Sequence, residues 1–185
     1  MEFEPLAIRG AWIARSPDHN DERGTFREWF RADEFRSKTG IDFHVVQANL
    51  SISKKGTLRG IHYSLAKSGQ AKWVTCTAGA IWDVVVDLRP TSPTFKESIA
   101  VKLSAERGGG VIVSSGLGHA FLALEDETVV SYLLTSEYSP DQESSINPFD
   151  AELSINWPDD KYLLSRQDAA APSLIDRLVQ GLLPK

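Results

Sequence analysis

The middle of the chain is a series of short runs of β-branched and aromatic residues separated by turn-forming residues. Seven runs predict strands, at residues 43–50, 72–77, 81–88, 97–103, 110–114, 119–123 and 128–134. No helical pattern of 10–15 residues lies between them, so parallel crossover connections are not expected. The pattern therefore predicts an all-β fold of mostly antiparallel strands, which is a sandwich, a jelly roll or a barrel.

Two short helices are expected to flank the strands. One covers residues 31–39 and ends at Gly40, which readily adopts the left-handed backbone conformation. The other begins after Ser173, a good N-cap, and Asp176 lies in its positively polarised first turn. Its apolar face is expected to cover the sheet and contains Leu174, Ile175, Leu178 and Leu182. Because no repeat or linker interrupts the sequence, we expect one domain over residues 1–185.

The charge balance bears on possible partners. The chain has 20 Lys and Arg against 25 Asp and Glu, a net charge of −5. It therefore has no general attraction to nucleic acid or to anionic membranes, and any phosphate must be held by a few positioned residues. No apolar run is long enough to span a membrane, the start of the chain is acidic, and the only cysteine, Cys76, lies in an apolar strand. These features predict a cytoplasmic protein.

The segment at residues 56–63 combines Arg59 and His62 with flanking glycines, and Lys72 follows at the start of a predicted strand. A second segment, residues 114–121, resembles the second motif of cupin jelly rolls and favours that fold. A metal-binding cupin would have a His-x-His pair, but Ser64 stands two residues after His62. A lysine in the pocket would also repel a divalent cation, so we expect neither a metal nor another cofactor.

A histidine base and a lysine together suit proton abstraction next to a carbonyl group. The imidazole of His62 accepts the proton, and the ammonium of Lys72 stabilises the enolate oxygen. Inversion of the carbon centre also requires a proton donor on its opposite face. Tyr132, on a late predicted strand, can supply a phenolic proton from across a jelly-roll cavity.

Several motifs in fixed order resemble those of the nucleotide-sugar 3,5-epimerases, typified by dTDP-4-dehydrorhamnose 3,5-epimerase. They are DERGTFRE at residues 21–28, QANLS at 47–51, KGTLRGIHY at 55–63, DVVVDLR at 83–89, SPTF at 92–95, GHAF at 118–121 and LSRQD at 164–168. The resemblance implies a dimeric, metal-free, cupin-like antiparallel jelly roll. Its substrate would be a dTDP-linked 4-keto-6-deoxyhexose, in which the C4 ketone acidifies C3 and C5.

The resemblance also implies roles for individual residues. The catalytic residues would be His62 as the base, Asp168 as the group that orients it, Lys72 as the cation at the C4 oxygen, and Tyr132 as the acid. The substrate-binding residues would be Arg23 and Arg59 at the diphosphate, Phe26, Glu28 and Tyr138 at the nucleobase, and Gln47, Asn49 and His119 at the sugar and phosphates. Part of the nucleotide site would come from the second subunit. From the residues alone, Asp83 is a candidate partner for Lys72.

Some segments depart from the usual family pattern, namely residues 132–135 (YLLT) and 144–150 (SSINPFD). This variant resembles the epimerases of antibiotic deoxysugar pathways, some of which invert only C3 or only C5. We expect inversion at C3 of dTDP-4-keto-6-deoxyglucose and leave C5 open. The alternatives are a 5-monoepimerase, a sugar-nucleotide 3,4-ketoisomerase on the same fold, and a non-catalytic carbohydrate-binding jelly roll.

Overall fold

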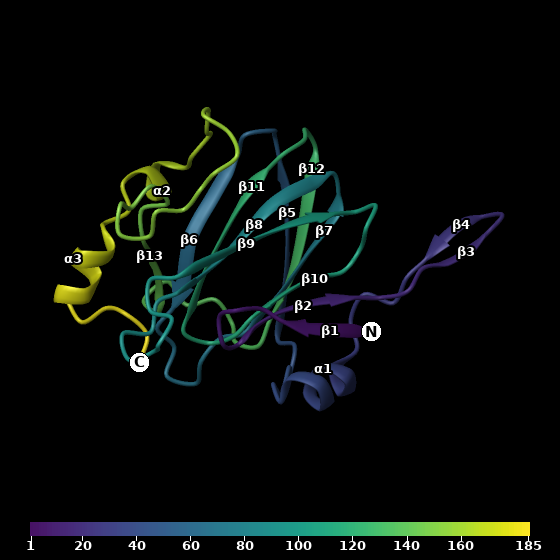
Figure 1. Ribbon diagram of the computed structural model, residues 1–185, viewed down its shortest axis with the longest axis horizontal. Coiled ribbons are helices and arrows are strands. Elements are labelled where there is room, and N and C mark those ends of the chain that lie inside the picture. The colour runs from purple at the N-terminus through teal and green to yellow at the C-terminus, as the bar shows by residue number, and fades with distance from the viewer.

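A computed structural model describes residues 1–185, and its main body is two antiparallel sheets packed face to face (Figure 1). The first sheet has the order β1 (Glu2–Pro5), β2 (Ala11–Arg15), β10 (Gly110–Val113), β7 (Lys72–Ala78), β12 (Thr128–Leu134), β5 (Gln47–Ser53). The second has the order β13 (Glu143–Ser145), β6 (Leu58–Ser64), β11 (Leu117–Ala123), β8 (Ala80–Asp87), β9 (Ser98–Ser104). Strands that follow one another in the chain repeatedly change sheet, so the predicted jelly roll is confirmed.

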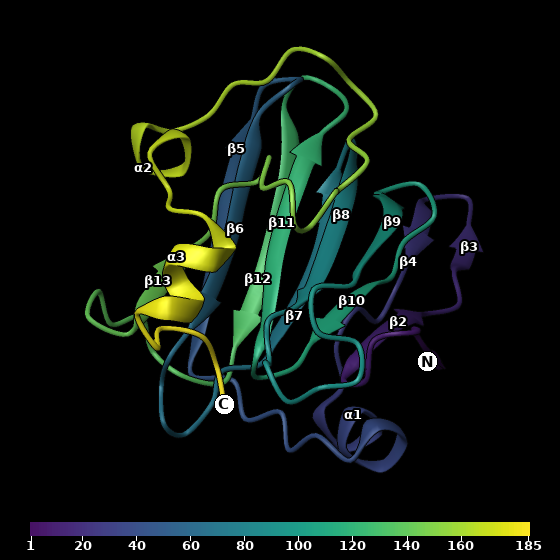
Figure 2. The same ribbon diagram turned by 60° about the vertical axis from the view of Figure 1, so that its left-hand side comes forward.

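The main core lies between the two sheets. It is built from alternate residues of facing strands, including Val74 on β7, Val130 on β12, Val85 on β8 and Phe121 on β11. A second core lies on the outer face of the second sheet, where the C-terminal segment covers it (Figure 2). Strand β8 is buried on both faces, which explains its continuous apolar run.

Helix α1 (Ala32–Thr39) packs beside the first sheet through a group of aromatic side chains. Phe35 meets Trp73 edge to face, with ring centroids 5.0 Å apart. The predicted cap is confirmed, since Gly40 ends the helix with φ 74°. The strand predicted at 43–50 instead begins at Gln47, because Phe43 packs against the α1 aromatic group from an irregular segment.

The C-terminal region contains α2 (Arg166–Ala169) and α3 (Leu174–Val179). Ser173 caps α3 in a reciprocal hydrogen-bonded arrangement with Asp176, as expected. The expectation that the apolar face of this helix covers the sheet holds only for Leu174, which packs into the core on the second sheet, because α3 is short. Other apolar side chains of this segment, Ile175, Leu178 and Leu182, remain partly exposed.

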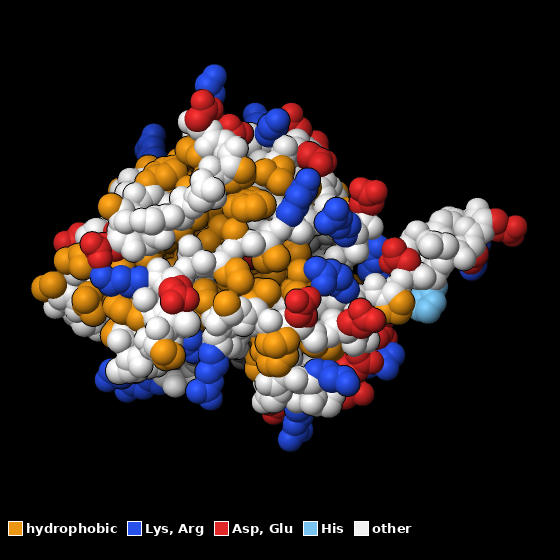
Figure 3. Space-filling model, in the orientation of Figure 1, with side chains coloured by type: hydrophobic (Ala, Val, Ile, Leu, Met, Phe, Trp, Pro, Cys, Tyr) orange, Lys and Arg blue, Asp and Glu red, His pale blue; other side chains and the backbone are white.

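A two-stranded arm made of β3 (His19–Asp21) and β4 (Gly24–Phe26) was not predicted. The arm extends away from the sheets and stands clear of the body in the space-filling view (Figures 1 and 3). Every residue of its two strands is exposed. No helix of the structure is both long and apolar enough to cross a membrane.

Candidate active site

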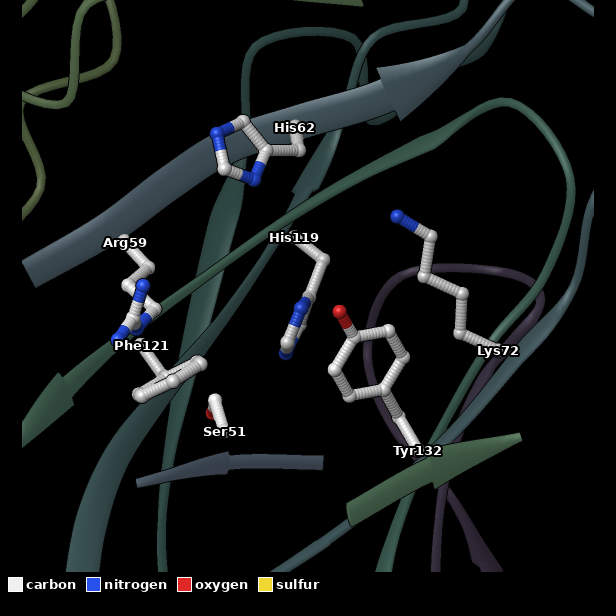
Figure 4. A pocket seen from close by; sticks show the side chains of 7 residues that line it. All are labelled: Ser51, Arg59, His62, Lys72, His119, Phe121 and Tyr132. Carbon is white, nitrogen blue, oxygen red and sulfur yellow. The ribbon is translucent and has the colours of Figure 1, made fainter. Parts of the chain in front are cut away.

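A cavity of about 170 Å³ opens between the two sheets (Figure 4). A second hollow of about 190 Å³ shares three of its residues, His62, Lys72 and Tyr132. The first is lined by Ser51, Arg59, His62, Lys72, His119, Phe121 and Tyr132. The second adds Asn49, Gln70, Leu134, Tyr138, Glu143, Ser144 and Gln167. The three residues that sequence analysis singled out for chemistry thus meet in one place.

Strand alternation explains why these side chains point inward. On β6, Ile61 and Tyr63 belong to the outer core, so His62 between them faces the space between the sheets. On β7, Lys72 shares a face with Val74, and on β12, Tyr132 shares a face with Val130, both members of the inner core. The base and the phenol therefore come from opposite sheets.

A β-bulge brings Arg59 to the same side of β6 as His62. His119 pairs with His62, whereas Phe121 pairs with Arg59, so β6 contains one residue more than its partner in this stretch. Gly60 lies within the bulge with φ 113°, and a Cβ there would lie 2.7 Å from the Cβ of Ala120. Only glycine fits this backbone position.

His62 is fixed by Asp168 at α2. The imidazole Nε2 donates to Asp168 Oδ1 at 2.6 Å, and the other ring nitrogen faces the cavity (Figure 4). Burial alone would raise the pKa of the Asp168 carboxyl, but hydrogen bonds from His62, Ser165 and the Gly60 amide hold it below its usual value. Because these hydrogen bonds keep the carboxyl ionised although its side chain is only 5 % exposed, a carboxylate supports the ring.

The Lys72 ammonium and the Tyr132 hydroxyl both point into the cavity (Figure 4). Burial lowers the pKa of Lys72 because it removes water from the charged amine, and the charge of Glu143 opposes this effect. None of the ion pairs in the chain involves Lys72. Its N–H donors are therefore available to a ligand.

The expectation that Asp83 is the partner of Lys72 is wrong. Asp83 is fully buried and lies on β8, in the other sheet from β7, and its Oδ2 accepts a hydrogen bond from His119 Nε2 at 2.8 Å. Its second oxygen, Oδ1, has no hydrogen-bond partner. His119 itself lines the cavity as expected, so Asp83 supports a cavity histidine rather than the lysine.

The expected ligand-binding residues discussed next lie in two places, one at the second hollow and one at the first cavity. Gln47 Nε2 donates to Asn49 Oδ1 at 3.0 Å, and Gln47 Oε1 accepts the backbone N–H of Tyr138 at 2.8 Å. This network places Asn49 and Tyr138 at the edge of the second hollow. Arg59 lines the first cavity, where its Nε donates to Ser53 at 3.2 Å.

The structure does not bring Arg23, Phe26 and Glu28 to this cavity. Arg23 is at the turn of the arm, with its side chain 85 % exposed and paired with Asp21. Phe26 is 70 % exposed, and together with Glu28 it lines a separate hollow near the base of the arm. Within a single chain, these residues and His62 belong to different sites.

Seven cavity residues were not found from the sequence: Ser51, Gln70, Phe121, Leu134, Glu143, Ser144 and Gln167. Ser51 and Phe121 lie inside family motifs, and alternation from Asn49 and His119 would have placed them on the cavity face. Gln70 and Glu143 lie outside any recognised motif, so no sequence signal marked them. The structure contains no group of three or more His, Cys, Asp or Glu side chains that could hold a metal ion.

The fold and this arrangement define a cupin-like jelly-roll protein whose cavity has a carboxylate-supported histidine on one sheet and a lysine and a tyrosine on the other. Comparison with known families identifies it further. The family described as dTDP-4-dehydrorhamnose 3,5-epimerase matches residues 5–176, and the chain belongs to this family.

Two relatives and one solved structure show how similar the chain is to known proteins. It is 48 % identical to a dTDP-4-dehydro-6-deoxyglucose 3-epimerase of Streptomyces bikiniensis, over 98 % of this chain and 93 % of that one. It is 43 % identical to a dTDP-4-dehydrorhamnose 3,5-epimerase of Mycolicibacterium smegmatis, over 100 % and 91 %. The crystal structure of ChmJ, a 3′-monoepimerase from Streptomyces bikiniensis in complex with dTDP-quinovose, superposes with a TM-score of 0.94 at 48 % identity, covering 98 % of this chain and 92 % of ChmJ.

Proposed function

We propose that the protein epimerises dTDP-4-keto-6-deoxyglucose at C3. The C4 ketone acidifies the neighbouring C–H bond, and His62 removes that proton through the ring nitrogen that faces the cavity. The electron pair moves to the C4 oxygen, where the Lys72 ammonium stabilises the enolate. Tyr132 then donates its phenolic proton to C3 from the opposite face, which inverts the centre.

The observation that carries this proposal is the placement of acid and base on opposite sheets. His62 is on β6 of the second sheet and Tyr132 is on β12 of the first, with the cavity between them (Figure 4). A ring bound between the sheets presents one face to each residue. Lys72 lies at the same cavity, within reach of a carbonyl oxygen that both faces share.

The relatives support C3 as the centre. The Streptomyces bikiniensis protein, at 48 % identity, is named a 3-epimerase, and the Mycolicibacterium smegmatis protein, at 43 %, is named a 3,5-epimerase. The dTDP-quinovose bound to ChmJ supports a dTDP-linked 6-deoxyhexose as the substrate. We also propose that the protein is cytoplasmic. The free, buried thiol of Cys76 fits a reducing compartment.

The test is proton NMR of dTDP-4-keto-6-deoxyglucose with the enzyme in deuterium oxide, following the C3 and C5 signals separately. We expect loss of the C3 proton signal and formation of the C3 epimer, and His62→Asn serves as the control for uncatalysed exchange. Exchange at both centres would make it a 3,5-epimerase, and exchange at C5 alone would overturn the C3 assignment. A 3-keto product would indicate a ketoisomerase. The absence of any reaction would indicate a carbohydrate-binding protein without catalytic activity.

We further propose that the enzyme is a homodimer whose arms complete the sites of the opposite subunits. The exposed arm carries Arg23 and Phe26 away from the cavity of its own chain, so these residues can reach the nucleotide only at another molecule. The two subunits would exchange arms symmetrically, as closed dimers require.

Mixing two inactive variants tests this arrangement. Arg23→Ala damages the arm and His62→Asn damages the cavity, so a mixed dimer has one site in which both parts are intact. After subunit exchange, activity at low substrate concentration should recover to about one quarter of the wild-type value, because half of the dimers are mixed and each has one working site. No recovery would show that each arm serves its own chain.

A further inference from the structure

Glu143 is the only carboxylate that lines either part of the cavity. The other titratable groups that face Lys72 are neutral or cationic. They are Arg59 and His62 on β6, His119 on β11, Tyr132 on β12 and Tyr138 in the segment that follows β12. The carboxylates of Asp168 and Asp83 lie behind the two histidines and are engaged by them. Glu143 is thus the one anionic group open to the space around the ammonium.

The strand pairing explains how Glu143 reaches this space. Strand β13 forms the edge of the second sheet beside β6, where Glu143 pairs with Ser64 and Ser145 pairs with His62. Lys72 begins β7 in the first sheet. The carboxylate therefore approaches the ammonium from the opposite sheet, on the side of the hollow that also contains Tyr138.

Gln70 holds the Glu143 carboxylate in place. This amide is only 5 % exposed, and its Nε2 donates to Glu143 Oε1 at 3.1 Å and to Ser136 Oγ at 3.0 Å. Gln70 lies two residues before Lys72. The same short segment therefore contains both the Lys72 ammonium and the amide that holds the Glu143 carboxylate near it. Glu143 and Lys72 share no ion pair within 4 Å, which leaves the ammonium donors free.

We propose that Glu143 is a positioning residue that keeps the Lys72 ammonium protonated without occupying its hydrogen bonds. The proposal rests on the proposed function, because a protonated Lys72 matters only if it stabilises an enolate. A buried amine loses the hydration that favours its charged form, and a nearby negative charge restores part of that preference. The pKa of Lys72 shows both influences, since burial lowers it and Glu143 raises it.

Glu143→Gln tests the role because it removes the charge while keeping an oxygen that accepts the Gln70 hydrogen bond. The alkaline limb of the kcat–pH profile should move about one pH unit lower, so that kcat measured at a pH above the wild-type limb falls about tenfold. Glu143→Asp should keep the wild-type limb. Glu97→Gln, which removes an exposed carboxylate, should leave the profile unchanged. An unmoved limb in Glu143→Gln, or an equal shift in Glu143→Asp, would overturn the proposal.

A second measurement does not depend on turnover. Small acylating reagents attack only the neutral amine, so the rate at which Lys72 is labelled, followed by peptide mass spectrometry, reports its protonation. At a fixed pH below the alkaline limbs of both proteins, the folded Glu143→Gln protein should label at Lys72 about ten times faster than the wild type. An equal rate would refute the role of Glu143 even in an active enzyme, whereas faster labelling in a protein that does not exchange C3 would count only against the proposed function.

Discussion

Replacement of Asp168 by Asn probes how His62 is activated. The two carboxylate oxygens have different partners: Oδ1 accepts from His62 Nε2 at 2.6 Å, and Oδ2 accepts from Ser165 Oγ at 2.9 Å. In the variant, the amide oxygen can keep the bond to His62 while the amide nitrogen donates to the Ser165 hydroxyl, which rotates to accept it. The imidazole therefore keeps its tautomer, and only the negative charge is lost.

The magnitude follows from that single change. A hydrogen bond to a charged group contributes about 1.5–3 kcal/mol and a neutral one about 0.5–1.5 kcal/mol, so the charge itself contributes about 1–1.5 kcal/mol, and it matters most when His62 becomes an imidazolium in the transition state. Loss of the charge should slow proton abstraction by about 5- to 13-fold. Removal of the base itself, in His62→Asn, should cost about 10²- to 10⁴-fold.

The assay is the initial rate of deuterium uptake at C3 at constant pH, with thermal unfolding of each variant as the control for folding. A loss of less than about threefold in Asp168→Asn, while His62→Asn remains severely impaired, would refute the claim that the carboxylate activates the base. A loss as large as that of His62→Asn would show instead that the amide had turned and reversed the tautomer.

Three further predictions concern the proposed acid Tyr132, the buried carboxylate Asp87 at the end of β8, and Gly60 in the bulge of β6. Tyr132→Phe should still exchange the C3 proton but form the epimer about 10²- to 10⁴-fold more slowly, as comparison of deuterium uptake with product formation by NMR would show. Burial alone would raise the pKa of Asp87, but hydrogen bonds from Arg89 and two hydroxyl groups lower it from 3.8 to about 2. Its stabilisation of about 2 kcal/mol is thus present above pH 4 and lost as the pH falls toward 2, and Asp87→Asn should lack this acid-dependent loss in urea unfolding. Gly60→Ala should destabilise the protein by about 1–3 kcal/mol in the same measurement and should also lower activity, because it forces β6 away from β11 next to His62.

The sequence predicted the sheets well where burial imposed a pattern. Strands β7 to β12 were located within a few residues, because their side chains alternate between two cores, are buried on both faces or, on β9, alternate between the inner core and solvent. Strand β6 was interpreted only as a chemical motif, because Gly60 and the bulge interrupt its alternation. The arm strands are exposed throughout and three residues long, so no hydrophobic pattern marked them.

The sequence predicted which residues of a strand belong to the candidate site, but not which residues of different strands contact one another. His62, Lys72 and Tyr132 were each identified from the sequence, and alternation places all three on inward faces. Asp83 was assigned to Lys72 because the two are close in sequence, yet β7 and β8 enter different sheets. The neighbours of each side chain depend on strand order, which local pattern does not encode. Glu143 was missed for the same reason.

The two-sheet architecture itself favours epimerisation over movement of the carbonyl. Inversion requires that a proton leave one face of the carbon and return to the other, so a base and an acid must stand on opposite sides of the ring. The β6 strand supplies His62 from one sheet, and β12 supplies Tyr132 from the other. An enzyme that only shifts the carbonyl to the neighbouring carbon can work with one base on one face and has no need of the second group. If Tyr132→Phe abolished inversion but left exchange intact, the opposed placement would be the reason that this jelly roll acts as an epimerase.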